Sequence, residues 1–225
     1  MTTVHGPDSL DGPDSPTGTV AAISVVMPVH NEASTVAPAV RAIIGASRKV
    51  NLPVTLNVVF DRCTDSSEAQ VDELRAACVQ PEIRTLSGYF PHVNAARNAG
   101  VADAAVWGAS AGVALGCHWT AHTDPGSLVP PHWLSHLRDA ADAGHDLVIG
   151  VVHPTDDETP HAVLPEQARP SLGVRLDTLL AVGGFADTAT DGDLATVRRL
   201  KELGVPWTAT EDGQGAHQGA HSPTS

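Results

Sequence analysis

Basic residues are scarce in this sequence of 225 residues, which contains 13 lysines and arginines against 26 aspartates and glutamates. Proteins hold phosphate-rich partners with clustered lysine and arginine, whereas this chain has a net charge of −13 and no basic patch. We therefore expect no nucleic-acid partner and no binding to an anionic membrane surface.

Cysteine is also scarce. Cys63, Cys78 and Cys117 are widely spaced, odd in number and include no Cys-x-x-Cys pair, which argues against a disulfide framework and a cysteine-based zinc site. We interpret all three as reduced thiols and expect a cytoplasmic protein.

Long apolar runs and targeting signals are missing as well. The stretch at 99–117 resembles a membrane segment, but it is rich in Ala and Gly and contains Asp103, so we predict a buried helix and no transmembrane segment. The amino terminus has no basic region followed by an apolar core, so no signal peptide is predicted. We expect a disordered leader at 1–18, one domain at 19–210 and a disordered tail at 211–225.

What the sequence does contain is an alternation of apolar, β-branched segments with helical patterns. Strands are expected at residues 23–29, 54–60, 83–86, 118–123 and 146–152. Helices are expected at residues 31–44, 66–78, 93–114 and 131–143. Strands separated by helices imply right-handed crossovers, so the predicted fold class is α/β, with one open, mostly parallel sheet flanked by helices.

Polar side chains follow the expected strands at the point where each strand ends. Ligands of open α/β sheets bind beyond the carboxyl ends of the strands, so these side chains predict a site at one edge. Asp61 can accept from a nucleobase or a ribose hydroxyl, Arg97 can face a phosphate, and Asp124 can hold a divalent cation. The first strand contributes His30, Asn31 and Glu32 to the same edge.

Several of these residues have a simpler interpretation. Asn31 could cap the helix that follows it, and Asp65 could cap the next one, because both side chains are common at helix amino termini. Arg97 could be a surface residue paired with Asp103. The residues alone do not decide between these structural roles and ligand binding.

Five segments in order resemble the family-2 glycosyltransferases across nearly all of the expected domain. They are MPVHNE (27–32), FDRCTDSS (60–67), VNAARNAG (93–100), WTAHTDPGSLVPPHWL (119–134) and the segment from Leu172 to Gly204. The resemblance implies a GT-A-like, Rossmann-related fold that transfers a sugar, with inversion, from a nucleotide-diphospho-sugar donor. It also implies a divalent cation, Mg²⁺ or Mn²⁺, and a small-molecule or lipid-linked acceptor.

Carried over position by position, the resemblance gives the donor-binding residues their roles. It places Arg97 at the nucleotide, and Asp124 at the first aspartate of the family's Asp-x-Asp metal motif, where Gly126 departs from the second. The nucleoside pocket then comprises Pro28, His30, Asn31, Glu32 and Asp61.

The resemblance also supplies candidate catalytic residues. The turn 183–185 and the following Asp191 and Asp193 resemble the segment that presents the acceptor and a catalytic Glu-Asp pair. Asp193 aligns with the aspartate, which would deprotonate the acceptor hydroxyl. Gly192 replaces the glutamate. The alternative is that Asp191 caps a helix and Asp193 only favours the dipole of that helix.

Three functions are compatible with these residues. The first is an inverting glycosyltransferase. The second is a non-catalytic module that binds sugar nucleotides, which Gly126 and Gly192 favour. The third is a nucleotidyltransferase, against which the sequence offers no Gly-rich, Lys- or Arg-bearing phosphate loop near the first strand.

Overall fold

The computed structural model describes residues 18–152, 169–186, 192–210 and 216–217. The expected leader apart from Gly18, and most of the expected tail, therefore lie outside the described residues, as does Asp191.

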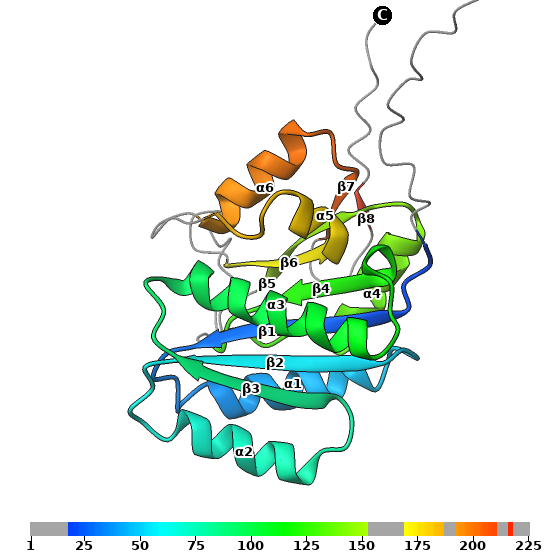
Figure 1. Ribbon diagram of the computed structural model, residues 1–225. Helices are drawn as coiled ribbons and strands as arrows, with labels where there is room; N and C mark the ends of the chain where they lie inside the picture. The colour runs from blue at the N-terminus through cyan, green and yellow to red at the C-terminus, as the bar shows by residue number, and fades with distance from the viewer. Residues whose placement is uncertain (1–17, 153–168, 187–191, 211–215, 218–225) are drawn as a thin grey trace, which may run out of the picture.

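The described residues form one eight-stranded sheet with the order β3-β2-β1-β4-β6-β5-β7-β8 (Figure 1). Its strands are β1 (Ala22–Val29), β2 (Val54–Asp61), β3 (Glu82–Gly88), β4 (His118–His122), β5 (Leu147–Val152), β6 (Arg169–Arg175), β7 (Trp207–Thr210) and β8 (Ala216–His217). The strands β3, β2, β1 and β4 are parallel, and β5 is parallel to β7. The predicted open, mostly parallel sheet is confirmed.

The antiparallel pairs lie in the second half of the sheet, where the sequence predicted no strand after residue 152 and so missed β6, β7 and β8. β6 runs antiparallel to both of its neighbours, β4 and β5, and β8 runs antiparallel to β7. β5 and β6 are antiparallel, and an antiparallel pair does not require a crossover helix between its two strands.

Helices cover both faces of the sheet. The structure has α1 (Val36–Ser47), α2 (Ser67–Ala77), α3 (Val93–Ser110), a 3₁₀ turn (Leu115–Cys117), α4 (Trp133–Asp142), α5 (Leu176–Ala181) and α6 (Gly192–Glu202). Figure 1 shows α3 on one face of the sheet and α1 and α2 on the other. In the described part of the chain, no helix is both long enough and apolar enough to span a membrane.

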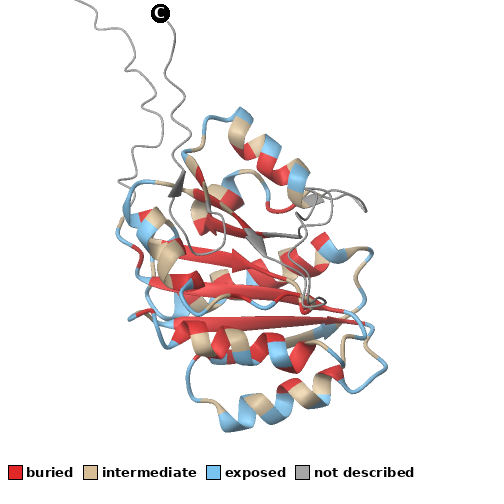
Figure 2. Cartoon of the chain, turned by 180° about the vertical axis from the view of Figure 1, so that it is seen from behind, coloured by how far each residue is buried: buried red, intermediate tan, exposed pale blue. Residues whose placement is uncertain are grey.

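Alternate residues of β1 enter two separate cores, as expected for a strand buried on both faces. Ile23, Val25 and Met27 pack with the apolar faces of α1 and α4, whereas Val26 packs with residues of α3, α5 and α6. Seen from behind, the central strands are buried along their length (Figure 2). This burial on both faces holds β1 in place between β2 and β4, and the three parallel strands end at the same edge of the sheet.

The helix α3 packs against the sheet with glycine at two of its inward positions. A Cβ added at Gly100 would lie 2.5 Å from Val26 Cγ1, and one added at Gly108 would lie 2.5 Å from His118 Nδ1. No other residue type fits these positions without displacing the helix. The close approach holds Arg97, one turn before Gly100, against the carboxyl edge of the sheet.

His118 is a buried histidine at the start of β4. Its Nε2 lies 2.8 Å from Ser24 Oγ, and its ring centroid lies 5.7 Å from that of Trp107. Among the residues that the structure describes, its Nδ1 has no hydrogen-bond partner. Burial lowers the pKa of His118 from 6.5 to about 4, because the charged imidazolium would lose its hydration.

This histidine should make stability fall in mild acid. The unfolded chain takes up a proton near the ordinary pKa of 6.5, whereas the folded His118 does so only near 4. Above pH 6.5, the protonation of this histidine therefore does not reduce the free energy of unfolding. As pH falls from 6.5 towards 4, the free energy of unfolding decreases by at most about 3 kcal/mol. Urea unfolding across this range should show a shallower pH dependence for His118→Gln than for the wild type. An exposed control, His132→Gln, should retain the wild-type dependence, and an unchanged slope in His118→Gln would contradict the assignment.

Candidate active site

The ends of β1 and β2 are shaped by two residues with left-handed backbone. Asn31 has φ 54° and Arg62 has φ 51°, and neither is glycine. The Asn31 Oδ1 accepts a hydrogen bond from Thr64 N at 2.8 Å, so it joins the loops after β1 and β2. The alternative that Asn31 caps α1 is wrong, because that helix begins later and its N-cap is Thr35.

Asp61 ends β2 as a buried carboxylate with several donors. Its Oδ1 accepts from Phe90 N at 3.0 Å, and both of its oxygens accept from Arg62 at 2.9 Å. Hydrogen bonding by Arg62 lowers the pKa of Asp61, with a further contribution from Phe90, although burial acts in the opposite direction. Asp61 is therefore an ionised acceptor in a fixed position.

The other predicted residues of β1 and its loop lie at the same end of the sheet. His30 Nδ1 lies 2.6 Å from the carbonyl oxygen of Asp61, and Glu32 accepts at Oε2 from Thr35 Oγ1 at 2.9 Å. Pro28 pairs with Val59 of β2 and lies beyond the last residue of β1 that pairs with β4. Its missing N–H therefore costs no hydrogen bond in the ladder with β4.

A second cluster brings Arg97, Asp124 and Asp193 together, although they come from distant parts of the sequence. Arg97 donates from one terminal nitrogen to Asp124 Oδ1 at 2.8 Å and from the other to Asp193 Oδ1. The Arg97 side chain is only 7% exposed, and its guanidinium carbon lies 5.8 Å from the ring centroid of Phe185. One buried cation thus joins the loop after β4 to the first turn of α6.

Two asparagines on the same face of α3 complete this cluster, and the sequence analysis assigned them no role. Asn98 exchanges two hydrogen bonds with the backbone of Phe185, at 2.8 and 3.0 Å. Asn94 Nδ2 donates to Ala186 O at 2.9 Å, and Asn94 Oδ1 accepts from Arg97 at 3.3 Å. The sequence contained a signal for this arrangement, because residues 94, 97 and 98 have i, i+3, i+4 spacing and therefore share one face of a helix.

His122 lies beneath the guanidinium at the end of β4. Its ring meets that of Phe185 edge to face, with centroids 4.6 Å apart, and its Nε2 lies 3.0 Å from Thr120 Oγ1. Burial, and secondarily the positive charge of Arg97, hold the pKa of His122 well below its ordinary value. The ring is therefore neutral, and Arg97 supplies the positive charge between the two carboxylates.

The model of "Glycosyl transferase family 2" matches residues 24–198, which is most of the chain. The protein belongs to glycosyl transferase family 2. The comparison with curated proteins gave no match.

Solved glycosyltransferases share the fold of this family member. S. aureus TarS 1–349 in complex with UDP superimposes with a TM-score of 0.65 at 13% identity, covering 86% of this chain and 59% of TarS 1–349. The mannosyltransferase PcManGT from Pyrobaculum calidifontis, with GDP-Man and Mn²⁺, gives 0.64 at 17% identity, with coverages of 84% and 55%. Glucosyl-3-phosphoglycerate synthase from Mycobacterium tuberculosis, with Mn²⁺, UDP and phosphoglyceric acid, gives 0.57 at 15%, with coverages of 93% and 75%. This chain therefore spans less than two thirds of the first two proteins, and the expected GT-A-like fold is confirmed.

The alternative that Arg97 is a surface residue paired with Asp103 is wrong. Asp103 instead accepts from Arg84 at 2.7 and 2.8 Å and from Asn57 at 2.6 Å. Arg97 and Asp103 are six residues apart on α3, so at about 3.6 residues per turn their side chains leave the helix in different directions.

A divalent cation does not fit the residues described around Asp124. In the described ranges, no group of three or more His, Cys, Asp or Glu side chains is placed to hold a metal ion. Asp124 already accepts from Arg97, and Gly126 brings no oxygen ligand at the second position of the family motif. Mg²⁺ and Mn²⁺ take several oxygen ligands, and of the two carboxylates in the family motif only Asp124 is present, already paired with Arg97.

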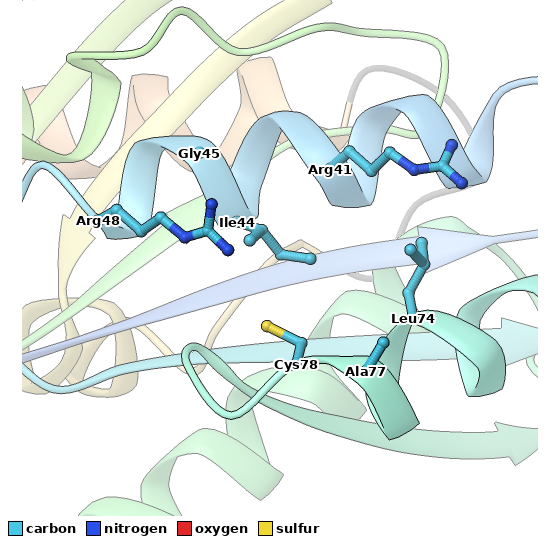
Figure 3. Close-up of a pocket in the computed structure, with 7 residues that line it drawn as sticks. All are labelled: Arg41, Ile44, Gly45, Arg48, Leu74, Ala77 and Cys78. Atoms are coloured by element: carbon cyan, nitrogen blue, oxygen red, sulfur yellow. The ribbon is translucent and has the colours of Figure 1, made fainter.

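A pocket of about 280 Å³ lies between α1 and α2, away from the clusters described above (Figure 3). None of the predicted site residues lines it, and α1 packs on the face of the sheet opposite to α3. We assign it no part in the site. Its lining consists of Arg41, Ile44, Gly45, Arg48, Leu74, Ala77 and Cys78.

Proposed function

We propose that this protein is an inverting glycosyltransferase that moves a sugar from a nucleotide-diphospho-sugar to the hydroxyl group of a small or lipid-linked acceptor. The family match supports sugar transfer, and the similar structures contain UDP or GDP-Man. The observation that carries the proposal is the bridge from Arg97 to Asp124 and Asp193, since it unites the expected diphosphate side and acceptor side of one site.

In this proposal, the donor and the acceptor meet at Asp193. Its carboxylate takes the proton from the acceptor hydroxyl while the acceptor oxygen forms a bond to the anomeric carbon. The bond from that carbon to the diphosphate oxygen breaks, and its electron pair leaves with the nucleoside diphosphate. Attack from the face opposite the leaving group inverts the anomeric configuration. Asp191, which lies outside the described residues, stays a second candidate from the family resemblance.

The nucleoside would occupy the ends of β1 and β2, where Asp61 presents its carboxylate beside His30 and Glu32. Asp61 can accept from a base N–H or a ribose hydroxyl through lone pairs that Arg62 and Phe90 leave available. A cytoplasmic location and the expected domain limits stay predictions, and no divalent cation enters the proposed mechanism.

Calorimetric titration of UDP, GDP and their sugar conjugates tests the proposal directly. Asp61→Ala should weaken nucleotide binding by about 10- to 100-fold, the value of a hydrogen bond to a charged group. Asp139→Ala is the matched control, because Asp139 also pairs with an adjacent arginine, Arg138, but at an exposed surface. Unchanged affinity in the Asp61→Ala variant would remove Asp61 from the pocket, and no binding of any of these compounds would refute the proposed function.

A non-catalytic sugar-nucleotide-binding module is the second candidate. Gly126 and Gly192 favour it, because both stand where the family carries a carboxylate. The two candidates differ in whether the donor is consumed. Release of UDP or GDP from the bound sugar nucleotide, with water as the acceptor, would support the transferase, whereas binding without any release would support the module.

A further inference from the structure

Arg97 lies at the point where the family resemblance expects a divalent cation. Its guanidinium is buried and contacts both Asp124 and Asp193. The two carboxylates are themselves largely covered, with side chains 12% and 23% exposed. Two carboxylates in this setting need a cation close to them, and Arg97 provides it.

The ion pairs given by the described residues of this cluster join one guanidinium to two carboxylates. The diphosphate of a sugar nucleotide would add further negative charge beside them. Gly126 supplies no second carboxylate for a metal ion, and the cation paired with Asp124 in this structure is the Arg97 guanidinium. A guanidinium suits this task because its planar donors match phosphate oxygens.

Arg97 also retains hydrogen-bonding capacity. Its terminal nitrogens donate to Asp124, Asp193 and Asn94, but in the described part of the chain its buried Nε has no partner. Buried donors are normally satisfied, so an unpaired N–H in a candidate site points to a ligand that is bound during function.

We propose that Arg97 takes the place of the divalent cation, binding the donor diphosphate and offsetting the charge of the leaving nucleoside diphosphate. This inference rests on the proposed function and changes one part of it, the requirement for metal. As the anomeric carbon–oxygen bond breaks, its electron pair passes to the diphosphate oxygen, and the guanidinium stabilises that oxygen without changing its own protonation.

The proposed replacement of the metal ion by Arg97 can also be tested by restoring the missing carboxylate at Gly126. A Cβ added at Gly126 would meet nothing within 4 Å, and this residue has no left-handed backbone conformation. Gly126→Asp can therefore introduce the second carboxylate of the family motif without a steric conflict. The variant would give Asp124 a partner for binding Mn²⁺.

The experiment is a titration of UDP and GDP into the full chain, first after EDTA treatment and then with Mn²⁺. The wild type should bind one of them with an affinity that Mn²⁺ changes by less than about threefold. Arg97→Gln should weaken that binding by about 10- to 100-fold, as expected for lost charged hydrogen bonds. Arg84→Gln, which removes another arginine that pairs with an aspartate, should not. In Gly126→Asp, Mn²⁺ should strengthen binding.

The outcomes separate this inference from the function on which it rests. If Mn²⁺ raises the wild-type affinity by more than about tenfold, or 1.4 kcal/mol, the protein uses a metal and the inference is wrong, while the proposed function stands. If neither nucleotide binds under either condition, the proposed function itself fails. The wild-type and Gly126→Asp titrations decide between these outcomes even if Arg97→Gln does not fold.

Discussion

The Asp193→Asn variant is expected to transfer sugar about 100 to 10,000 times more slowly than the wild type, which is the usual contribution of a general base. The asparagine can still accept from Arg97 through its side-chain oxygen, so the position of the guanidinium should be retained. Donor affinity should be at least as high as in the wild type, because one negative charge near the diphosphate is removed. The rate is measured as release of UDP or GDP from the sugar nucleotide, and the affinity by calorimetry.

Glu202→Gln is the control for this variant, because Glu202 lies exposed at the other end of α6. It should leave both the rate and the affinity unchanged. A fully active Asp193→Asn variant would refute the general-base assignment and leave Asp193 as a structural partner of Arg97. Loss of donor binding together with the rate would indicate a disrupted site instead of a missing base.

Removal of the Arg175 side chain should have the largest effect on stability. Arg175 donates to Asp146 Oδ1 at 2.6 Å and to the carbonyl oxygens of Gly18 at 3.0 Å, Gly116 at 2.5 Å and Ala141 at 3.3 Å. Its side chain is 2% exposed, so Arg175→Met removes one buried donor from each of these acceptors and leaves Asp146 without this counter-ion. We expect a loss of about 3 to 5 kcal/mol in the free energy of unfolding.

Thermal unfolding followed by circular dichroism measures this effect. For a chain of this size, such a loss should lower the Tm by about 6 to 20 °C. Arg138→Met is the matched control, because the ion pair of Arg138 with Asp139 lies on the surface and should contribute about 1 kcal/mol or less. Equal effects of the two substitutions would contradict the structural role of Arg175.

The parallel half of the fold could be predicted from sequence because each of its elements has its own pattern. β1 and β2 are mostly apolar and rich in β-branched residues, and the strands were expected within a few residues of their observed limits. The polar residues that follow them, including Asp61 and Asp124, were correctly expected at the ends of strands. In that half, local sequence and final structure agree, as they do in minimally frustrated proteins.

The second half depends on contacts that no local pattern reveals. β6 pairs antiparallel with both β4 and β5, so its position is determined by strands distant in sequence. Arg175 at its end looks like an ordinary surface arginine until four separate segments provide it with acceptors. Likewise, the bridge from Arg97 to Asp193 depends on how α6 packs, and residues 97 and 193 are far apart in the chain. Their roles in transfer stay predictions.

The bond between Arg97 and Asp193 also bears on the sequence of events in a catalytic cycle. The proposed base accepts a hydrogen bond from the guanidinium. A sugar nucleotide whose phosphates draw on the same guanidinium competes with that bond and leaves the carboxylate available to a hydroxyl. An acceptor that arrives first finds the base engaged. Substrate addition would then be ordered, with the nucleotide sugar entering before the acceptor and the nucleoside diphosphate leaving last.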